Sequence, residues 1–306
     1  MTTTTATPTG PHVDHYPSRV EPEPSITPRR DPVAYPDTTG SLPHPLDTAE
    51  VERFDRDGYL VLEGLFGEDE AQAYLDELTR LSDRDDVSAD PRTILEPEDD
   101  EVRSVFEVHA VSERFDALLR DSRLVDAARQ LLGGSVYLHQ SRVNLKPALR
   151  GKEFFWHSDF ETWHVEDGMP RMRALSCSIA LTENNEFNGP LMVVPGSHRW
   201  YVACVGKTPE RHYEQSLRRQ EYGVPDHESL RRLVERGGID APKGRAGSVV
   251  VFDCNMMHAS GVNLSPYPRS TVFVVYNSVE NALVAPFGVD EPRPTYIASR
   301  EAAPVT

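Results

Sequence analysis

Residues 135–146 read SVYLHQSRVNLK, a run in which polar side chains occupy the even positions from Gln140 to Lys146. Successive side chains on a strand point to opposite faces of the sheet, so this alternation predicts a strand with one polar face. A polar row inside a β core is costly unless it lines a wet cavity, and a strand with one face in solvent explains the run equally well. More strand-like runs follow, broken by Gly, Pro and Asn. They cover residues 153–160, 172–182, 190–195, 247–254 and 270–277.

From Asp47 to Leu132 the chain has mainly helical periodicity. Asp47 and Glu50 form a capping box that opens one helix, and apolar residues at helical spacing predict others over 71–81, 115–119 and 124–132. A helical insertion rich in Arg and Glu is expected over about 209–236. Helices followed by many short strands are typical of a mainly β fold, a jelly roll or barrel flanked by α-helices.

The first 47 residues differ in composition from the rest. They hold ten of the 25 prolines and have almost no apolar periodicity. We therefore predict a flexible tail over residues 1–43, followed by a single domain over residues 44–306.

Charge and apolar content exclude several classes of partner. The chain has 32 Lys and Arg against 49 Asp and Glu, a net charge of -17, which repels nucleic acids and anionic membranes. No apolar run reaches the roughly 18 residues of a membrane span, and the N-terminus lacks a secretory signal, so we expect a cytoplasmic protein. Its three widely spaced cysteines fit reduced, buried thiols better than disulfides or a zinc knuckle.

Residues 154–164, FFWHSDFETWH, contain the candidate metal ligands. If the strand continues, His157 and Asp159 project from the same face, and His258 follows a later strand that brings in a third ligand. Two histidines and one carboxylate leave three positions open on an ion, which suits oxygen activation by Fe(II). A lone His-x-Asp often arises by chance, but Arg269 adds a bidentate fork for a carboxylate, such as the far end of 2-oxoglutarate.

The other histidines are better explained as structural residues. His198 lies in a turn, and His164 faces away from His157 if the strand continues. His109 and His139 have no carboxylate neighbour at ligand spacing.

Residues 154–170, FFWHSDFETWHVEDGMP, resemble the signature of ectoine hydroxylases within the phytanoyl-CoA dioxygenase superfamily. The run GPLMVVPGSH at residues 189–198 and the position of Arg269 eleven residues after His258 extend the resemblance over most of the chain from about Asp47 onward. Only the Pro-rich N-terminus lies outside it.

The resemblance implies a cupin-like double-stranded β-helix in a cytoplasmic, generally homodimeric enzyme. It implies Fe(II), 2-oxoglutarate and O2 as requirements, and hydroxylation of the compatible solute ectoine to 5-hydroxyectoine with release of succinate and CO2, a reaction linked to osmotic stress. The implied iron ligands are His157, Asp159 and His258. By position, the residues around 2-oxoglutarate are Arg269, Ser260, Asn144 and Phe154, and those facing ectoine are Gln140, Thr162, Trp163 and Phe273.

Ectoine carries a delocalised cationic amidine and a carboxylate. Stacking of Trp163 on that cation is worth about 1–2 kcal/mol when desolvated, although a purely structural Trp is the simpler interpretation of the residue alone. The carboxylate of Asp159 favours hydroxylation over halogenation, because halogenases replace that ligand with a small residue to admit chloride.

Three other functions stay open at this point. The same oxygenase chemistry is compatible with another small amino-acid-like substrate or with an acyl carrier thioester. A cupin-like zinc hydrolase or isomerase uses similar ligands but leaves Arg269 without a role. A binding module without catalysis predicts no oxygen consumption.

Overall fold

The computed structural model describes residues 13–96, 101–217 and 222–306. Its strands are β1 (Ser25–Pro28), β2 (Tyr59–Leu62), β3 (Thr93–Leu95), β4 (Val102–Phe106), β5 (Val136–Lys146), β6 (Phe154–His157), β7 (Ala174–Ala180), β8 (Leu191–Val193), β9 (Trp200–Ala203), β10 (Val249–Asp253), β11 (His258–Ser260) and β12 (Arg269–Ser278). Its helices are α1 (Thr48–Asp57), α2 (Glu68–Ser82), α3 (Asp85–Ser88), α4 (Val108–Val111), α5 (Glu113–Leu119), α6 (Ser122–Leu132), α7 (Asp159–Thr162), α8 (Tyr213–Ser216) and α9 (His227–Gly237). Single turns at Trp163–Asp167 (π-helical), Ser197–Arg199 and Val279–Asn281 (both 3-10) complete the described elements.

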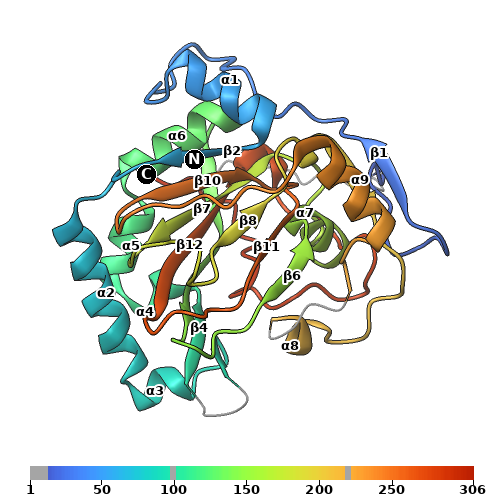
Figure 1. Cartoon of the computed structure of the whole chain (residues 1–306). Coiled ribbons are helices and arrows are strands. Elements are labelled where there is room, and N and C mark those ends of the chain that lie inside the picture. The colour runs from blue at the N-terminus through green and yellow to red at the C-terminus, as the bar shows by residue number, and fades with distance from the viewer. Residues whose placement is uncertain (1–12, 97–100, 218–221) are drawn as a thin grey trace, which may run out of the picture.

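Two antiparallel sheets form the core (Figure 1). The large sheet has seven strands in the order β2-β10-β7-β12-β5-β4-β3, and the small sheet has the order β6-β11-β8. Leu191 and Val193 of β8 pack against Val250 and Phe252 of β10, so the two sheets face one another. This arrangement confirms the predicted mainly β, cupin-like core flanked by helices.

Helices α2, α5 and α6 cover the outer face of the large sheet (Figure 1). Their buried residues Leu78, Phe115 and Leu131 pack in one cluster with Val143 of β5 and Val272 of β12. Each such side chain contributes about 1.5–3 kcal/mol when fully buried. The opposite face of the same strands is therefore left for the small sheet and the cavity between them.

Most predicted elements are confirmed, including the capping box. Asp47 accepts a hydrogen bond from the Glu50 amide at 2.8 Å, and the Glu50 carboxylate accepts one from the Asp47 amide at 2.9 Å. The expected insertion near residues 209–236 contains α8 and α9, and residues 218–221 lie outside the described part of the chain. Cys177, Cys204 and Cys254 are buried free thiols, as predicted.

The N-terminal segment differs from the flexible tail expected over residues 1–43. Residues 1–12 lie outside the described part, but residues 13–43 pack on the core, and β1 pairs antiparallel with β9. Tyr16 is 2% exposed, and its hydroxyl donates to Asp31 at 2.8 Å. A proline-rich segment needs no regular periodicity to dock, because individual side chains such as Tyr16 supply the buried contacts.

The strand expected over residues 153–160 ends earlier, at His157. His157 pairs with His258, the first residue of β11, so the ladder has no partner strand beyond this point. The chain turns into α7 at Asp159, and His164 falls in the π-helical turn. The prediction that His157 and Asp159 share one strand face is therefore wrong, although the two side chains still converge.

Gly168 ends this turned segment at a φ of +83°. A Cβ at this position would lie 2.2 Å from the carbonyl oxygen of Val284, so only glycine fits. The amide of Val284 donates to the carbonyl oxygen of Gly168 at 2.9 Å. This bond fixes the C-terminal segment against the site.

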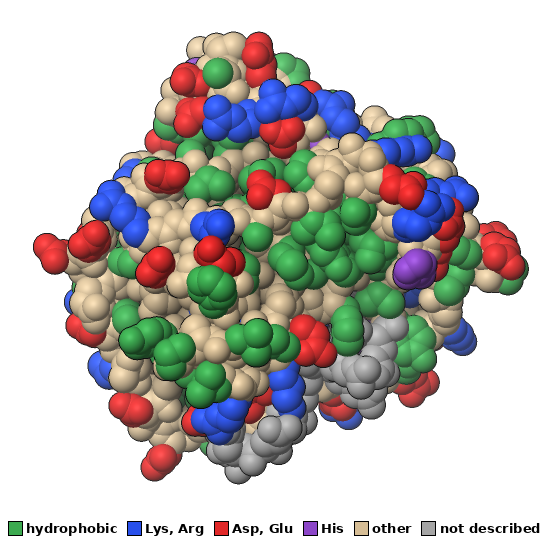
Figure 2. All heavy atoms as spheres, in the orientation of Figure 1, with side chains coloured by type: hydrophobic (Ala, Val, Ile, Leu, Met, Phe, Trp, Pro, Cys, Tyr) green, Lys and Arg blue, Asp and Glu red, His purple; other side chains and the backbone are tan. Residues whose placement is uncertain are grey.

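The surface agrees with a solvated, acidic protein. On the face shown in Figure 2, Asp and Glu side chains are interspersed with Lys and Arg. Within the described ranges, no helix is both long and apolar enough to cross a membrane.

Candidate metal centre

His157, Asp159 and His258 converge on one point between the two sheets. One potential ligand atom from each residue lies within 4.8 Å of the others. The Nε2 atom of His157 is 3.5 Å from Asp159 Oδ1, and that of His258 is 3.9 Å from Oδ2. The three residues come from the end of β6, the start of α7 and the start of β11.

Backbone carbonyls set the orientation of both imidazoles. The Nδ1 atom of His157 lies 2.7 Å from the Phe155 carbonyl oxygen, and that of His258 lies 2.9 Å from the Met256 carbonyl oxygen. A carbonyl only accepts, so in the neutral ring Nδ1 carries the proton and Nε2 presents its lone pair to the centre. Metal-binding histidines commonly have such support, and the residues present fit a divalent metal ion.

The electrostatic environment holds His258 and Asp159 in their ligating forms. Burial lowers the pKa of His258 to about 4, and the neighbouring His157 acts in the same direction, so the His258 ring is neutral at pH 7. Burial opposes ionisation of Asp159, but His258, His157 and Arg142 outweigh it and hold the pKa of this carboxylate below its usual value. A neutral imidazole and an ionised carboxylate are the forms that bind metal.

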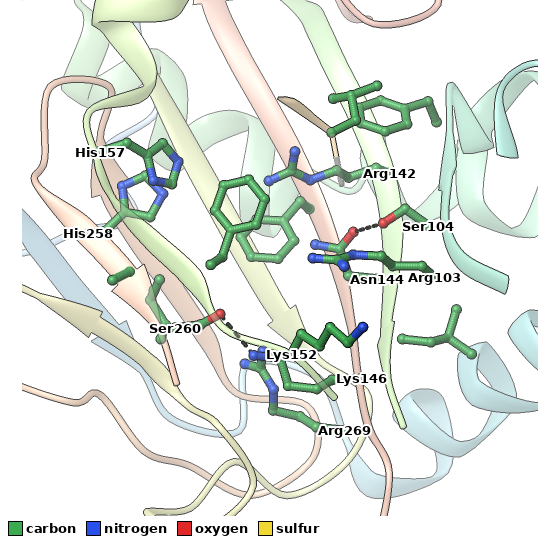
Figure 3. Close-up of a pocket in the computed structure, with 17 residues that line it drawn as sticks. Arg103, Ser104, Arg142, Asn144, Lys146, Lys152, His157, His258, Ser260 and Arg269 are labelled. Atoms are coloured by element: carbon green, nitrogen blue, oxygen red, sulfur yellow. Dashed lines mark hydrogen bonds between the residues drawn. The ribbon is translucent and has the colours of Figure 1, made fainter. Parts of the chain in front are cut away.

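A cavity runs from the two histidines to a group of cationic side chains on the large sheet (Figure 3). Arg269 is 8% exposed, and within the described residues no carboxylate forms an ion pair with it. Lys146 Nζ donates to Ser260 Oγ at 2.9 Å. Burial lowers the pKa of Arg269 to about 10, and burial together with Arg269 and Arg103 lowers that of Lys146 to about 6. Arg269, a desolvated cation without an ion-pair partner among the described residues, makes this end of the cavity suited to an anion.

All four residues expected around 2-oxoglutarate line this cavity: Arg269, Ser260, Asn144 and Phe154. The Phe154 ring lies 5.0 Å from that of His157, next to the metal ligands. Asn144 accepts a hydrogen bond from Ser104 Oγ at 2.6 Å through its Oδ1 atom.

A second cavity adjoins the first at Arg142, Phe154 and His157 and is also lined by Asp159. Gln140, Thr162 and Trp163 line it, as expected for residues that face a substrate. The Gln140 amide donates to the Ile297 carbonyl oxygen at 2.7 Å, which fixes the orientation of its side chain. The fourth residue expected to face the substrate, Phe273, lines the first cavity instead, with the Arg142 guanidinium 5.0 Å from its ring centroid.

The sequence and structure comparisons agree with this geometry. The family model for phytanoyl-CoA dioxygenase (PhyH) matches residues 54–271. Ectoine dioxygenase from Bordetella parapertussis is 54% identical over 95% of this chain and 94% of its own length. The chain belongs to the phytanoyl-CoA dioxygenase family and, within it, to the ectoine dioxygenases. Ectoine dioxygenase from Streptomyces coelicolor is 49% identical over the full length of both chains.

Solved structures of EctD from S. alaskensis have the same fold. The structure with bound Fe aligns with a TM-score of 0.84 at 47% identity, over 96% of this chain and 97% of that one. The structure with 2-oxoglutarate and 5-hydroxyectoine aligns with a TM-score of 0.80 at 47% identity, over 96% of this chain and 100% of that one. The epimerase SnoN, at 21% identity and a TM-score of 0.56, shares the fold alone.

Five basic residues that line the two cavities were not assigned to the site from the sequence. Arg103, Lys146 and Lys152 line the first cavity, Arg293 lines the second and Arg142 lines both. Alternation along β5 already placed Arg142 and Lys146 on one polar face, which was the available signal. Arg293 had none, because it lies outside helices and strands, where its bonds to Asp167 at 2.8 and 2.5 Å depend on the tertiary fold.

The histidines that the sequence set aside do not join the centre. His164 is buried between the Met169 carbonyl oxygen and Asp14, at 2.8 and 2.9 Å. His198 is bonded to the Asp55 carbonyl oxygen at 3.0 Å.

Proposed function

We propose that this chain hydroxylates ectoine to 5-hydroxyectoine, consuming 2-oxoglutarate and O2 and releasing succinate and CO2. The observation that carries the proposal is the convergence of His157, Asp159 and His258 next to a cavity that ends at Arg269, which has no ion-pair partner in the part of the chain that the structure describes. The ectoine dioxygenases at 49–54% identity supply the substrate.

His157, Asp159 and His258 are the proposed iron ligands. Bound Fe(II) supplies the oxidation by coupling decarboxylation of 2-oxoglutarate to transfer of one oxygen atom from O2 to the substrate. The ligand set supports iron over a purely structural ion, because three protein ligands leave positions for 2-oxoglutarate and O2. The contribution of the protein is then to place both organic molecules at this centre.

Arg269 is the proposed anchor for the far carboxylate of 2-oxoglutarate. Its guanidinium can form two parallel hydrogen bonds to a carboxylate, and the absence of an acidic partner among the described residues leaves that capacity for a ligand. Lys146 and Ser260 lie beside this anchor, and Asn144 and Phe154 line the path to the histidines.

The second cavity is the proposed ectoine site. Trp163 offers a ring face to the cationic amidine. Gln140 and Thr162 offer polar side chains, and Arg293 supplies positive charge for the ectoine carboxylate. Phe273 is assigned to the side of the site that faces Arg142. Gln140, Thr162 and Trp163 are buried and Phe273 is half-buried, which favours the exclusion of water from the reacting centre.

An end-point assay tests the proposed function. The full-length protein is incubated with Fe(II), 2-oxoglutarate and O2, and succinate is measured with ectoine, with proline and with acyl carrier thioesters. We expect succinate and 5-hydroxyectoine in equal amounts with ectoine alone. Product from proline or a thioester but not ectoine would transfer the same chemistry to another substrate. If none of these substrates caused oxygen consumption and the protein was active when loaded with Zn(II) in place of Fe(II), a hydrolase or isomerase would be favoured.

We further propose a cytoplasmic homodimer, with residues 44–306 as a single oxygenase domain. The resemblance to ectoine hydroxylases supports the location, the dimer and the single domain. Light scattering of the purified protein is expected to give twice the chain mass of 34.3 kDa. A monomer mass at working concentrations would contradict the dimer.

A further inference from the structure

A buried arginine of the N-terminal segment contacts the helical segment next to the metal ligands. The Arg19 side chain is 2% exposed. Its Nε and Nη2 atoms donate to the two carboxylate oxygens of Glu161 at 3.0 and 2.6 Å. Its Nη1 atom donates to Glu166 at 2.6 Å and to Thr208 Oγ1 at 2.8 Å. One guanidinium therefore joins the N-terminal segment to two acids of the segment 159–167.

The two acids flank Thr162 and Trp163, which line the second cavity. Glu161 is two residues after Asp159 and directly before Thr162 and Trp163. Glu166 belongs to the π-helical turn and lies 3.3 Å from Nδ1 of His212, another residue that lines the second cavity. A displacement of either carboxylate therefore shifts side chains of the proposed ectoine site.

Protein groups enclose the Arg19–Glu161 pair. Ser18 Oγ donates to Glu161 at 2.6 Å. Gly223 covers the pair at a φ of +71°, and a Cβ there would lie 2.4 Å from both Arg19 Nη2 and Glu161 Oε2. Removing one partner of a buried ion pair strands the other charge, so loss of Arg19 is expected to displace the Glu161 carboxylate.

The strained backbone of Arg19 indicates that surrounding contacts fix the position of this residue. Its φ of +60° lies in the left-handed region, which a residue with a Cβ rarely adopts. The Arg19 amide donates to the Cys204 carbonyl oxygen at 2.8 Å, which holds this conformation. Local strain of this kind persists only where surrounding contacts determine it.

We infer that Arg19 is a positioning residue for hydroxylation, which holds segment 159–167 so that Asp159 meets the metal and Trp163 meets the substrate. The inference rests on the proposed function for its substrate. Arg269 and Ser260 lie on β12 and β11, outside the segment, so the proposed anchor for the far carboxylate of 2-oxoglutarate does not depend on Arg19.

The test compares Arg19→Gln and Arg19→Lys in the full-length protein with a matched variant, Arg29→Gln. Arg29 belongs to the same N-terminal segment, and its guanidinium pairs in a buried position with Asp253 at 2.7 Å; among the described residues it bonds to none of segment 159–167. Arg29→Gln therefore loosens the same segment without freeing Glu161. The measurements are the KM for ectoine, the KM for 2-oxoglutarate, the Tm, and Mn(II) binding by calorimetry as a readout independent of turnover.

Arg19→Gln is expected to raise the KM for ectoine by about 10- to 100-fold, because small displacements of positioning groups have effects of this size. The same variant is expected to bind Mn(II) more weakly and to keep its KM for 2-oxoglutarate within about twofold of the wild-type value. Arg19→Lys is expected to restore part of the wild-type KM for ectoine and of the Mn(II) affinity. Arg29→Gln lowers the Tm with both KM values unchanged. If Arg19→Gln lowers the Tm with both KM values and Mn(II) affinity unchanged, Arg19 is merely structural and the inference fails.

A milder variant covers the case in which Arg19→Gln does not fold. Thr208→Val removes one hydrogen-bond acceptor of Arg19 without stranding a charge, and is expected to raise the KM for ectoine by about two- to fivefold. An unchanged KM and Mn(II) affinity in a folded Thr208→Val would overturn the inference. If the wild-type protein made no hydroxyectoine, the proposed function would be wrong. The difference in Mn(II) affinity between the wild type and the Arg19 variants would still decide the role of Arg19.

Discussion

His157 and His258 are directly paired residues on neighbouring strands, and their ring centroids lie 4.2 Å apart. The ladder between β6 and β11 thus brings together two ligands that are 101 residues apart in the sequence. Because the backbone pairing holds the imidazoles in place, little side-chain ordering remains for metal binding to impose. Asp159 then completes the set from the first residue of α7.

Replacement of either histidine is expected to weaken metal binding. His157→Ala and His258→Ala each remove one nitrogen ligand, and we predict at least a 100-fold loss of Fe(II) affinity, since outer-shell partners alone contribute about 10- to 100-fold. Anaerobic calorimetry measures it. His109→Ala, which removes a histidine bonded to Ser141 outside the centre, is expected to bind iron as the wild type does. Normal iron affinity in both ligand variants would refute the assignment.

Arg269→Gln tests the 2-oxoglutarate anchor. A charge-assisted hydrogen bond contributes about 1.5–3 kcal/mol, so the KM for 2-oxoglutarate is expected to rise about 10- to 150-fold. The KM for ectoine should change little, because Arg269 does not line the second cavity. The exposed Arg245→Gln serves as the charge-matched control. A rise in the KM for ectoine alone would place the anchor elsewhere.

Lys146 makes the stability of the ligand-free protein depend on pH. Burial, Arg269 and Arg103 lower its pKa from 10.5 to about 6 in the folded chain. Between these values the unfolded chain binds more protons, so the contribution of Lys146 to the free energy of unfolding increases as the pH rises through this window. At low pH the full cost of a buried charged amine is present.

We therefore expect the Tm of the protein without 2-oxoglutarate to rise more steeply between pH 6 and 8 in the wild type than in Lys146→Met. Thermal unfolding at a series of pH values measures the slope. The exposed Lys243→Met is expected to keep the wild-type slope. Parallel slopes for wild type and Lys146→Met would mean that the amine stays charged in the folded chain.

Trp163→Leu tests the proposed contact with the amidine. Loss of a desolvated cation–π contact of about 1–2 kcal/mol is expected to raise the KM for ectoine about 5- to 30-fold, with the KM for 2-oxoglutarate unchanged. Trp200→Leu is a matched control, because Trp200 stacks with Arg236 at 4.2 Å, away from both cavities. Equal effects of the two substitutions would assign Trp163 a packing role.

Local patterns predicted much of the fold because they depend on neighbours in the sequence. The capping box at Asp47, the helical spacing of Leu131 and the alternation along β5 each reflect local geometry, and all three are present. The candidate metal ligands could be proposed from the sequence because His157 and Asp159 are close in sequence and Arg269 follows His258 at a short distance.

Features that depend on distant partners could not be predicted in this way. β6 ends at His157 because its partner strand begins at His258, a fact that no residue near position 157 encodes. The docking of the N-terminal segment depends on carboxylates such as Glu161, over 140 residues away. Arg293 likewise meets Asp167 only in the folded chain.

The most direct test of the account compares the wild type with Asp159→Ala under Fe(II), 2-oxoglutarate and ectoine, with 5-hydroxyectoine and succinate quantified together. If Asp159 binds the iron, the wild type forms the two products in equal amounts, and so does Asp76→Ala, which replaces an exposed acid on α2. A folded Asp159→Ala is then expected to form no detectable hydroxyectoine. Hydroxyectoine formed by Asp159→Ala at the wild-type rate would remove this carboxylate from the iron site and contradict the account.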